Sequence, residues 1–82
     1  MTEENGVDDL IIKVLGHKER KRILRIIASY PEGVSYTGIL GETGLSTGRL
    51  NYHLGELEGF ITRNENRQYS LSELGEKAVA TL

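Results

Sequence analysis

The sequence predicts a mainly α-helical domain with one small β-hairpin, an α+β fold. Apolar residues recur at helical spacing in several segments, and glycine or proline separates these segments. One later stretch, residues 60–71, alternates with a period of two instead. A chain of 82 residues, 38% of them hydrophobic, is the size of one domain with a modest core. We therefore expect a single domain over residues 7–82, preceded by a polar, disordered segment at residues 1–6.

Two helices are predicted first, over residues 7–16 and 18–29. The apolar stripe of the first helix consists of Val7, Leu10, Ile11 and Val14. Their i, i+3, i+4, i+7 spacing forms one helix face. This stripe is large for so short a helix, so we expect the core to cover part of it and a partner subunit the rest. The second helix carries isoleucines on its buried side and ends at the turn formed by residues 31–33.

A short helix, a turn and a longer helix follow. Thr37 is the predicted N-cap of a helix over residues 38–43, and Gly44 suits the left-handed conformation that ends a helix. Ser46 is expected to cap the next helix, over residues 46–58. This order is typical of a helix-turn-helix.

The helix over residues 46–58 has a leucine-rich back and a polar front. Leucines at 45, 50, 54 and 57 share one side. The front consists of Thr47, Arg49, Asn51 and Tyr52. Such a helix fits the major groove of DNA, where arginine can bind guanine and asparagine can bind adenine. The alternative is an ordinary amphipathic helix whose polar face is solvated.

Residues 60–71 are predicted to form a hairpin, and residues 34–36 have strand character but are too short to pair with more than one neighbour. Residues 64–66 form the expected hairpin tip. Ser72 is the predicted cap of a final helix. The apolar side of that helix consists of Leu74, Ala78 and Leu82. The predicted order is therefore helix, helix, strand, helix, helix, strand, strand, helix.

The formal net charge of −2 at first counts against binding to nucleic acid. The distribution of charge is uneven, however, because residues 17–33 hold five basic and two acidic side chains. This basic stretch is either a solvated helix face or a surface that meets phosphate.

Composition excludes several other classes of site. Without cysteine and with two separated histidines, we expect no metal site and no cofactor. No nucleophile–base constellation and no glycine-rich phosphate loop is visible, so we expect no enzyme. The longest apolar run is the three residues 10–12, and no signal peptide is recognisable, which predicts a soluble, cytoplasmic protein with no membrane partner.

Two stretches resemble winged helix-turn-helix transcriptional regulators of the ArsR type, the arsenical-resistance repressors, particularly small archaeal and bacterial members. Residues 15–24 (LGHKERKRIL) are similar to the family's pattern at the start of its second helix. Residues 45–61 contain LNYHL and then LEGFI, similar to the family's recognition helix running into its first wing strand. The resemblance covers about residues 10–76.

The resemblance implies a homodimeric regulator, expected to be a repressor, that binds a double-stranded DNA operator. It implies dimerisation through the first and last helices, and hence through Val7, Leu10, Ile11, Val14, Leu74, Ala78 and Leu82. Metal-sensing members place cysteines in the third helix, whereas residues 39–43 have none here. The family's metal sensor is therefore not expected, and the sequence indicates neither an effector nor an operator.

Ten residues are candidates for DNA contact. They are Thr47, Arg49, Asn51, Tyr52 and His53 of the recognition helix, Arg63 and Arg67 of the wing, Ser35, Thr37 and Arg22. The wing arginines are positioned to reach the minor groove or phosphates, and the last three to reach phosphates. For His53 a bond to phosphate or to backbone is expected. The competing hypothesis is a winged-helix module that binds protein or dimerises without binding DNA, favoured by the acidic surplus.

Overall fold

The computed structural model describes the backbone of residues 2–82 and the side chains of residues 6 and 9–82. Over this range the elements are α1 (Thr2–Leu15), α2 (Lys18–Ala28), β1 (Val34–Ser35), α3 (Tyr36–Thr43), α4 (Thr47–Glu56), β2 (Ile61–Arg63), β3 (Gln68–Leu71) and α5 (Glu73–Ala80). The predicted α+β class and the predicted order of elements are confirmed. The molecule has the arrangement of a winged helix-turn-helix.

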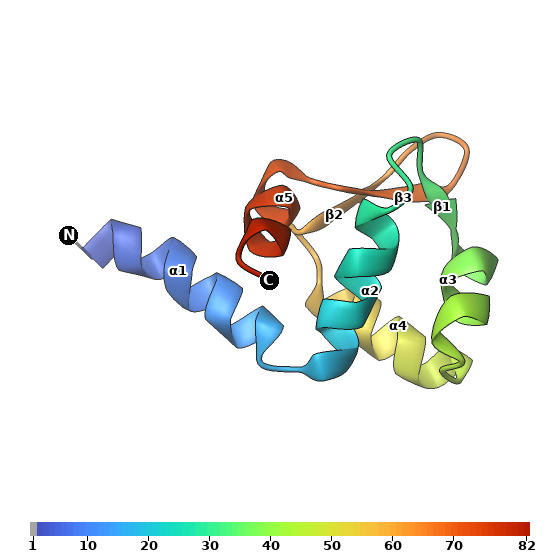
Figure 1. Cartoon of the computed structure of the whole chain (residues 1–82), viewed down its shortest axis with the longest axis horizontal. Coiled ribbons are helices and arrows are strands. Elements are labelled where there is room, and N and C mark those ends of the chain that lie inside the picture. Colours follow the sequence, from blue (N-terminus) through green and yellow to red (C-terminus); the bar gives the residue numbers. More distant parts are fainter. Residues whose placement is uncertain (1) are drawn as a thin grey trace.

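The three strands form one antiparallel sheet in the order β1-β3-β2. Val34 pairs with Tyr69 and Ile61 pairs with Leu71, so β3 joins the hairpin to the strand that precedes α3. The sheet is small, and α2 and α5 lie close to it while α1 extends away from the body (Figure 1). This extension helps to give the chain its elongated outline of 41 × 24 × 18 Å.

Helix α1 is longer than the sequence indicated. It begins at Thr2, so residues 2–6, expected to be disordered, continue the helix, while Met1 lies outside the described residues. Because the apolar stripe begins only at Val7, the periodicity contained no signal for the polar first turns. The Val7 side chain also lies outside the described residues.

The core is aliphatic and draws on almost every element. Its fully buried side chains are Ile23, Leu24, Ile27, Ile39, Leu50 and Leu57. Phe60 adds the aromatic bulk just before β2 and is 3% exposed. Burying one such aliphatic side chain contributes about 1.5–3 kcal/mol to stability. The core therefore fixes α4 by its leucine side, and the polar side of α4 is left to solvent.

Serine hydroxyls begin three of the helices. Ser46 Oγ accepts a hydrogen bond from Arg49 N at 3.2 Å, and Ser72 Oγ accepts one from Gly75 N at 3.1 Å, as predicted. The prediction for α3 was wrong, because Ser35 and not Thr37 is its N-cap, with Gly38 N donating to Ser35 Oγ at 3.0 Å. The helix starts two residues earlier than its apolar pattern suggested.

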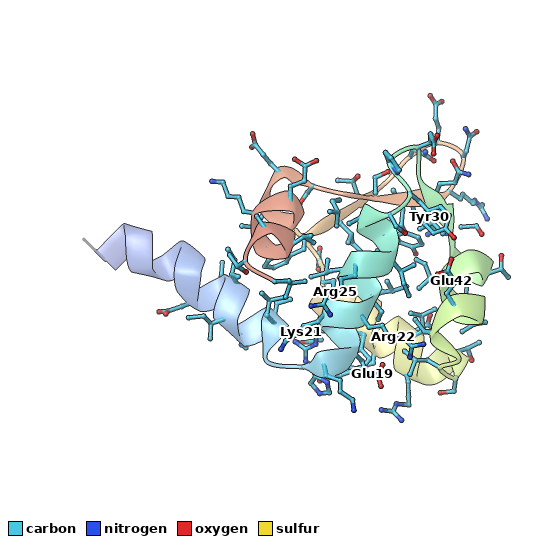
Figure 2. All side chains as sticks on the ribbon, viewed as in Figure 1. Glu19, Lys21, Arg22, Arg25, Tyr30 and Glu42 are labelled. Atoms are coloured by element: carbon cyan, nitrogen blue, oxygen red, sulfur yellow. The ribbon has the colours of Figure 1, made fainter. Side chains whose placement is uncertain are left out.

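Helix α3 ends at Gly44, which has a φ of 70° and whose N–H donates to Leu40 O at 3.0 Å. The predicted left-handed glycine is confirmed. Arg22 of α2 then donates from Nη1 to Thr43 O at 3.1 Å and from Nη2 to Glu42 O at 2.9 Å. Tyr30, just after α2, donates its hydroxyl hydrogen to the Glu42 carboxylate. Figure 2 shows Arg22 of α2 and Tyr30, which follows α2, near Glu42 of α3.

Gly75 is required where α5 meets the hairpin. A Cβ atom at this position would overlap the Phe60 carbonyl oxygen, which accepts a hydrogen bond from Ser72 N. We predict that Gly75→Ala lowers the free energy of unfolding by about 3 kcal/mol, because the α5 and Phe60 backbones must separate. Urea unfolding of the two proteins measures the difference.

The matched control is Gly41→Ala in α3, where a Cβ would have open space and no positive φ is involved. This change should raise the free energy of unfolding by about 0.5–1 kcal/mol, because alanine loses less backbone entropy in a helix. Equal stability of Gly75→Ala and the natural protein would contradict the close approach of α5 to Phe60.

Candidate nucleic-acid interface

The polar residues of α4 are exposed to solvent. Thr47, Arg49, Asn51 and Tyr52 are all exposed, and Tyr52 has 56% of its surface accessible. Leu50, on the opposite side of the same helix, is completely buried. The structure therefore leaves all four side chains predicted to lie on the front of this helix exposed to solvent.

A hydrogen bond connects this face of α4 to the start of α3. Tyr36 Oη donates to Asn51 Oδ1 at 2.8 Å, so one acceptor site of the amide oxygen is occupied. The Asn51 nitrogen remains available as a donor on an exposed side chain. Sequence reasoning missed Tyr36, because nothing in a separation of 15 residues indicates that two side chains meet.

The start of α3 adjoins the wing, which is the hairpin of β2 and β3, through the sheet. Tyr36 follows Ser35, and Ser35 pairs with Gln68 of β3. Two predicted contact residues, Ser35 and Thr37, are exposed here, but the Ser35 hydroxyl is occupied as the cap of α3. A series of contacts therefore connects Asn51 to the start of α3, and the start of α3 to the wing.

The wing presents two arginines. The Arg63 guanidinium lies over the Tyr69 ring, 5.1 Å from its centroid, a distance suited to a cation–π contact. Arg67 is exposed and has a left-handed backbone, with φ at 62°. Asn64 Oδ1 shapes the tip by accepting hydrogen bonds from Asn66 N and Gln68 N, both at 2.9 Å. Both arginines are exposed, as the prediction requires.

Two predicted contact residues are placed differently. His53 is only 2% exposed, so it belongs to the buried side of α4 and not to its polar face. Arg22 is exposed but bonded to the end of α3, so its guanidinium is engaged within the fold. The burial of His53 therefore corrects its predicted DNA contact, whereas the DNA contact of the exposed Arg22 stays a prediction.

His53 lies in a polar cluster between α4 and the start of α2. Its ring is 4.8 Å from the His17 ring and 5.1 Å from the Tyr52 ring, and both pairs are edge-on. Arg20, which is 6% exposed, approaches Glu56 of α4 at 4.0 Å. Arg20 therefore contributes to the fold and not to a surface that meets phosphate.

Burial lowers the pKa of His53 most, and the nearby positive groups His17, Arg20 and Arg49 lower it further, while Glu19 opposes them. Among the described residues His53 Nδ1 has no hydrogen-bond partner. The neutral imidazole is thus the form that the fold accommodates.

The predicted dimer residues whose side chains are described divide into three groups. Ile11, Val14 and Ala78 are buried within the chain itself and belong to its core, so these three are not available to a partner. Leu10 is 52% exposed and Leu82 is exposed, whereas Leu74 is half-buried. The exposed Ile12, which the helical stripe did not include, adds a second accessible apolar residue on α1.

The helix-turn-helix with its β-hairpin defines the winged-helix class of fold. A family model, described as domain of unknown function DUF7347, matches residues 9–82, and the chain belongs to this family. No curated protein and no solved structure matches the chain.

Two further features are settled for the described part of the chain. No helix there is both long and apolar enough to cross a membrane. No group of three or more His, Asp or Glu side chains is placed there to hold a metal ion.

The burial of His53 predicts how stability depends on pH. A lowered pKa means that protons bind the unfolded chain more readily than the folded one. Stability should be complete above the ordinary histidine pKa of about 6.5 and should fall as the pH drops below it. Urea unfolding between about pH 7.5 and 5.5 measures this fall, which His53→Gln should diminish.

His17→Gln provides the control, because burial and not His17 is the largest cause of the lowered pKa. This variant should keep most of the pH dependence. A natural protein with constant stability across that interval would show that His53 is not held in its neutral form.

Proposed function

We propose that this protein is a homodimeric transcriptional regulator that binds a specific double-stranded DNA sequence and represses by occupying it. The observation that supports this most is the polar face of α4, exposed as a group and joined through Tyr36 to the start of α3. A recognition helix followed by a hairpin wing is how winged-helix proteins present side chains to a duplex.

In this proposal α4 lies in the major groove with its capped N-terminal end foremost. Arg49 is the residue best suited to a bidentate contact with guanine, since its guanidinium is exposed and forms no ion pair with any residue that the structure describes. Asn51 offers its amide nitrogen to an acceptor on a base edge, while Tyr36 holds its oxygen. Thr47 and Tyr52 flank these two and contact phosphate or a thymine methyl group.

The wing acts beside the groove in the proposed complex. Arg67 extends from the hairpin tip and neutralises a phosphate or enters the minor groove. Arg63 is steadied by the Tyr69 ring, which limits its rotamers and therefore the entropy lost on binding. The wing contributes affinity and orientation, and α4 contributes the base sequence.

The acidic surplus of the whole chain does not oppose this arrangement. The net charge is −2, but the exposed Arg63 and Arg67 of the wing, together with Arg49, place positive charge on the face where DNA would lie. Local potential, more than total charge, governs association with a polyanion. Selection of bound sequences from random duplex DNA tests the function directly and reveals the half-site spacing of a dimer.

Two arginine variants separate base recognition from phosphate binding. Arg49→Ala should weaken the selected site by about 1–3 kcal/mol and relax the preference at one base pair. Arg67→Asn, which suits the left-handed backbone, should weaken all sequences alike and reduce the salt slope by about one. Fluorescence anisotropy at several salt concentrations measures both effects.

Lys77→Ala is the control, because it removes one exposed positive charge from α5, on a different element. It should leave affinity and salt slope nearly unchanged. If duplex binding is absent, or shows no salt slope and ignores both arginines, the fold serves instead as a module that binds protein.

The proposed dimer forms through the exposed flank of α1 that contains Leu10. Leu10→Asp should convert a dimer into a folded monomer, because the buried carboxylate would lack a partner. Sedimentation velocity at micromolar concentration measures the change, and circular dichroism verifies the fold. Ile12→Asp, on another flank of α1, should remain dimeric. A natural protein that sediments as a monomer would contradict this interface.

A further inference from the structure

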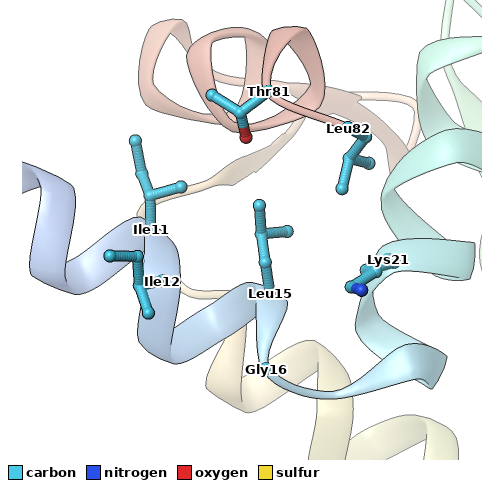
Figure 3. Close-up of a pocket in the computed structure, with 7 residues that line it drawn as sticks. All are labelled: Ile11, Ile12, Leu15, Gly16, Lys21, Thr81 and Leu82. Carbon is cyan, nitrogen blue, oxygen red and sulfur yellow. The ribbon is translucent and has the colours of Figure 1, made fainter.

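A cavity of about 520 Å³ lies where the end of α1, the start of α2 and the C-terminal residues meet. Figure 3 shows Ile11, Ile12 and Leu15 on its α1 side, and Thr81 and Leu82 across from them. Sites for small molecules commonly measure about 300–1,000 Å³. The cavity opens to solvent beside Ile12, which is 67% exposed.

The walls are aliphatic. The described lining contains no aromatic ring, so it offers nothing on which a planar ring would stack. Thr81 Oγ1 already donates to Ala78 O at 2.7 Å, so its hydroxyl hydrogen is not available to a ligand. A flexible hydrocarbon chain is the group that such walls bind best, because it gains contact without losing hydrogen bonds.

Lys21 supplies the positive charge of the described lining. It comes from α2 and is half-buried (Figure 3). Among residues that the structure describes, its ammonium forms no ion pair with a carboxylate. A lysine whose stem lies along an apolar wall places its ammonium where it can pair with an anionic group.

We propose that this cavity binds a medium-chain aliphatic monocarboxylate. The hydrocarbon chain lies against Ile11, Ile12 and Leu15, and the carboxylate pairs with the Lys21 ammonium. The two halves of the site match the two halves of such a molecule, an apolar tail and a single negative head. Neither half alone specifies the ligand.

The geometry of α1 separates this site from the proposed dimer face. Residues two apart on an α-helix project about 160° from each other, so Leu10 and Ile12 occupy nearly opposite flanks. Ile12 lines the cavity and Leu10 does not. A second copy seated on the Leu10 flank therefore leaves the cavity open.

The test is an NMR titration of the full chain with octanoate, at octanoate concentrations below its micelle concentration. Amide chemical shifts report the binding. Saturable shifts should appear at Ile12, Leu15, Gly16 and Leu82. Octanol, with the same chain but no charge, should bind about two- to fivefold more weakly, the effect of one partly exposed ion pair. The measurement contains no DNA, so its result is independent of the proposed regulatory function.

Lys21→Gln should weaken octanoate binding by about two- to fivefold and leave octanol binding unchanged. Lys18→Gln is the control, since Lys18 is exposed on the same helix and does not line the cavity. Equal binding of octanoate and octanol, or shifts located elsewhere, would overturn the proposal. So would shifts of these amides that follow protein concentration while octanoate has no effect, because a second copy would then fill the cavity.

Discussion

The position of the exposed helix α4 depends on how α3 ends. Gly44 reverses the chain in a left-handed conformation, and Leu45 N donates to Thr43 Oγ1 at 3.3 Å within the turn. The two carbonyls that α3 leaves open at Glu42 and Thr43 are bound by Arg22 of α2. Because unsatisfied terminal carbonyls would let the helix fray, this arginine holds α3, the turn and therefore α4 in one orientation.

The basic residues of α2 make different contacts, although their side chains are of the same type in the sequence. Arg22 joins α2 to α3, and Arg20 is buried beside Glu56 of α4. Arg25 is exposed on the face of α2 that Figure 2 presents, while α4 passes behind α2 in Figure 1. A basic run along one helix therefore says little about where a polyanion binds, since the fold uses two of these charges for itself.

The sequence predicted the order of elements because apolar periodicity and caps are local signals. Ser46 and Gly44 were recognised by their own chemistry. The cap of α3 was misassigned because Ser35 and Thr37 are both good capping residues, and only the pairing of Ser35 with the sheet places the helix start. His53 was misplaced because it adjoins exposed Tyr52, and its burial depends on packing against α2. Tertiary contacts decided each case that local chemistry left open.

The apolar residues of helix α1 lie in three different surroundings. Ile11 and Val14 face the core, which leaves Leu10 on one flank and Ile12 on the other. Packing against the core requires only Ile11 and Val14. Leu10 and Ile12 therefore add apolar surface that is exposed to water. Two exposed flanks separated by a buried centre can serve two occupants without competition. Such an arrangement leaves one side of the helix for the proposed second copy, while the other side borders an aliphatic cavity.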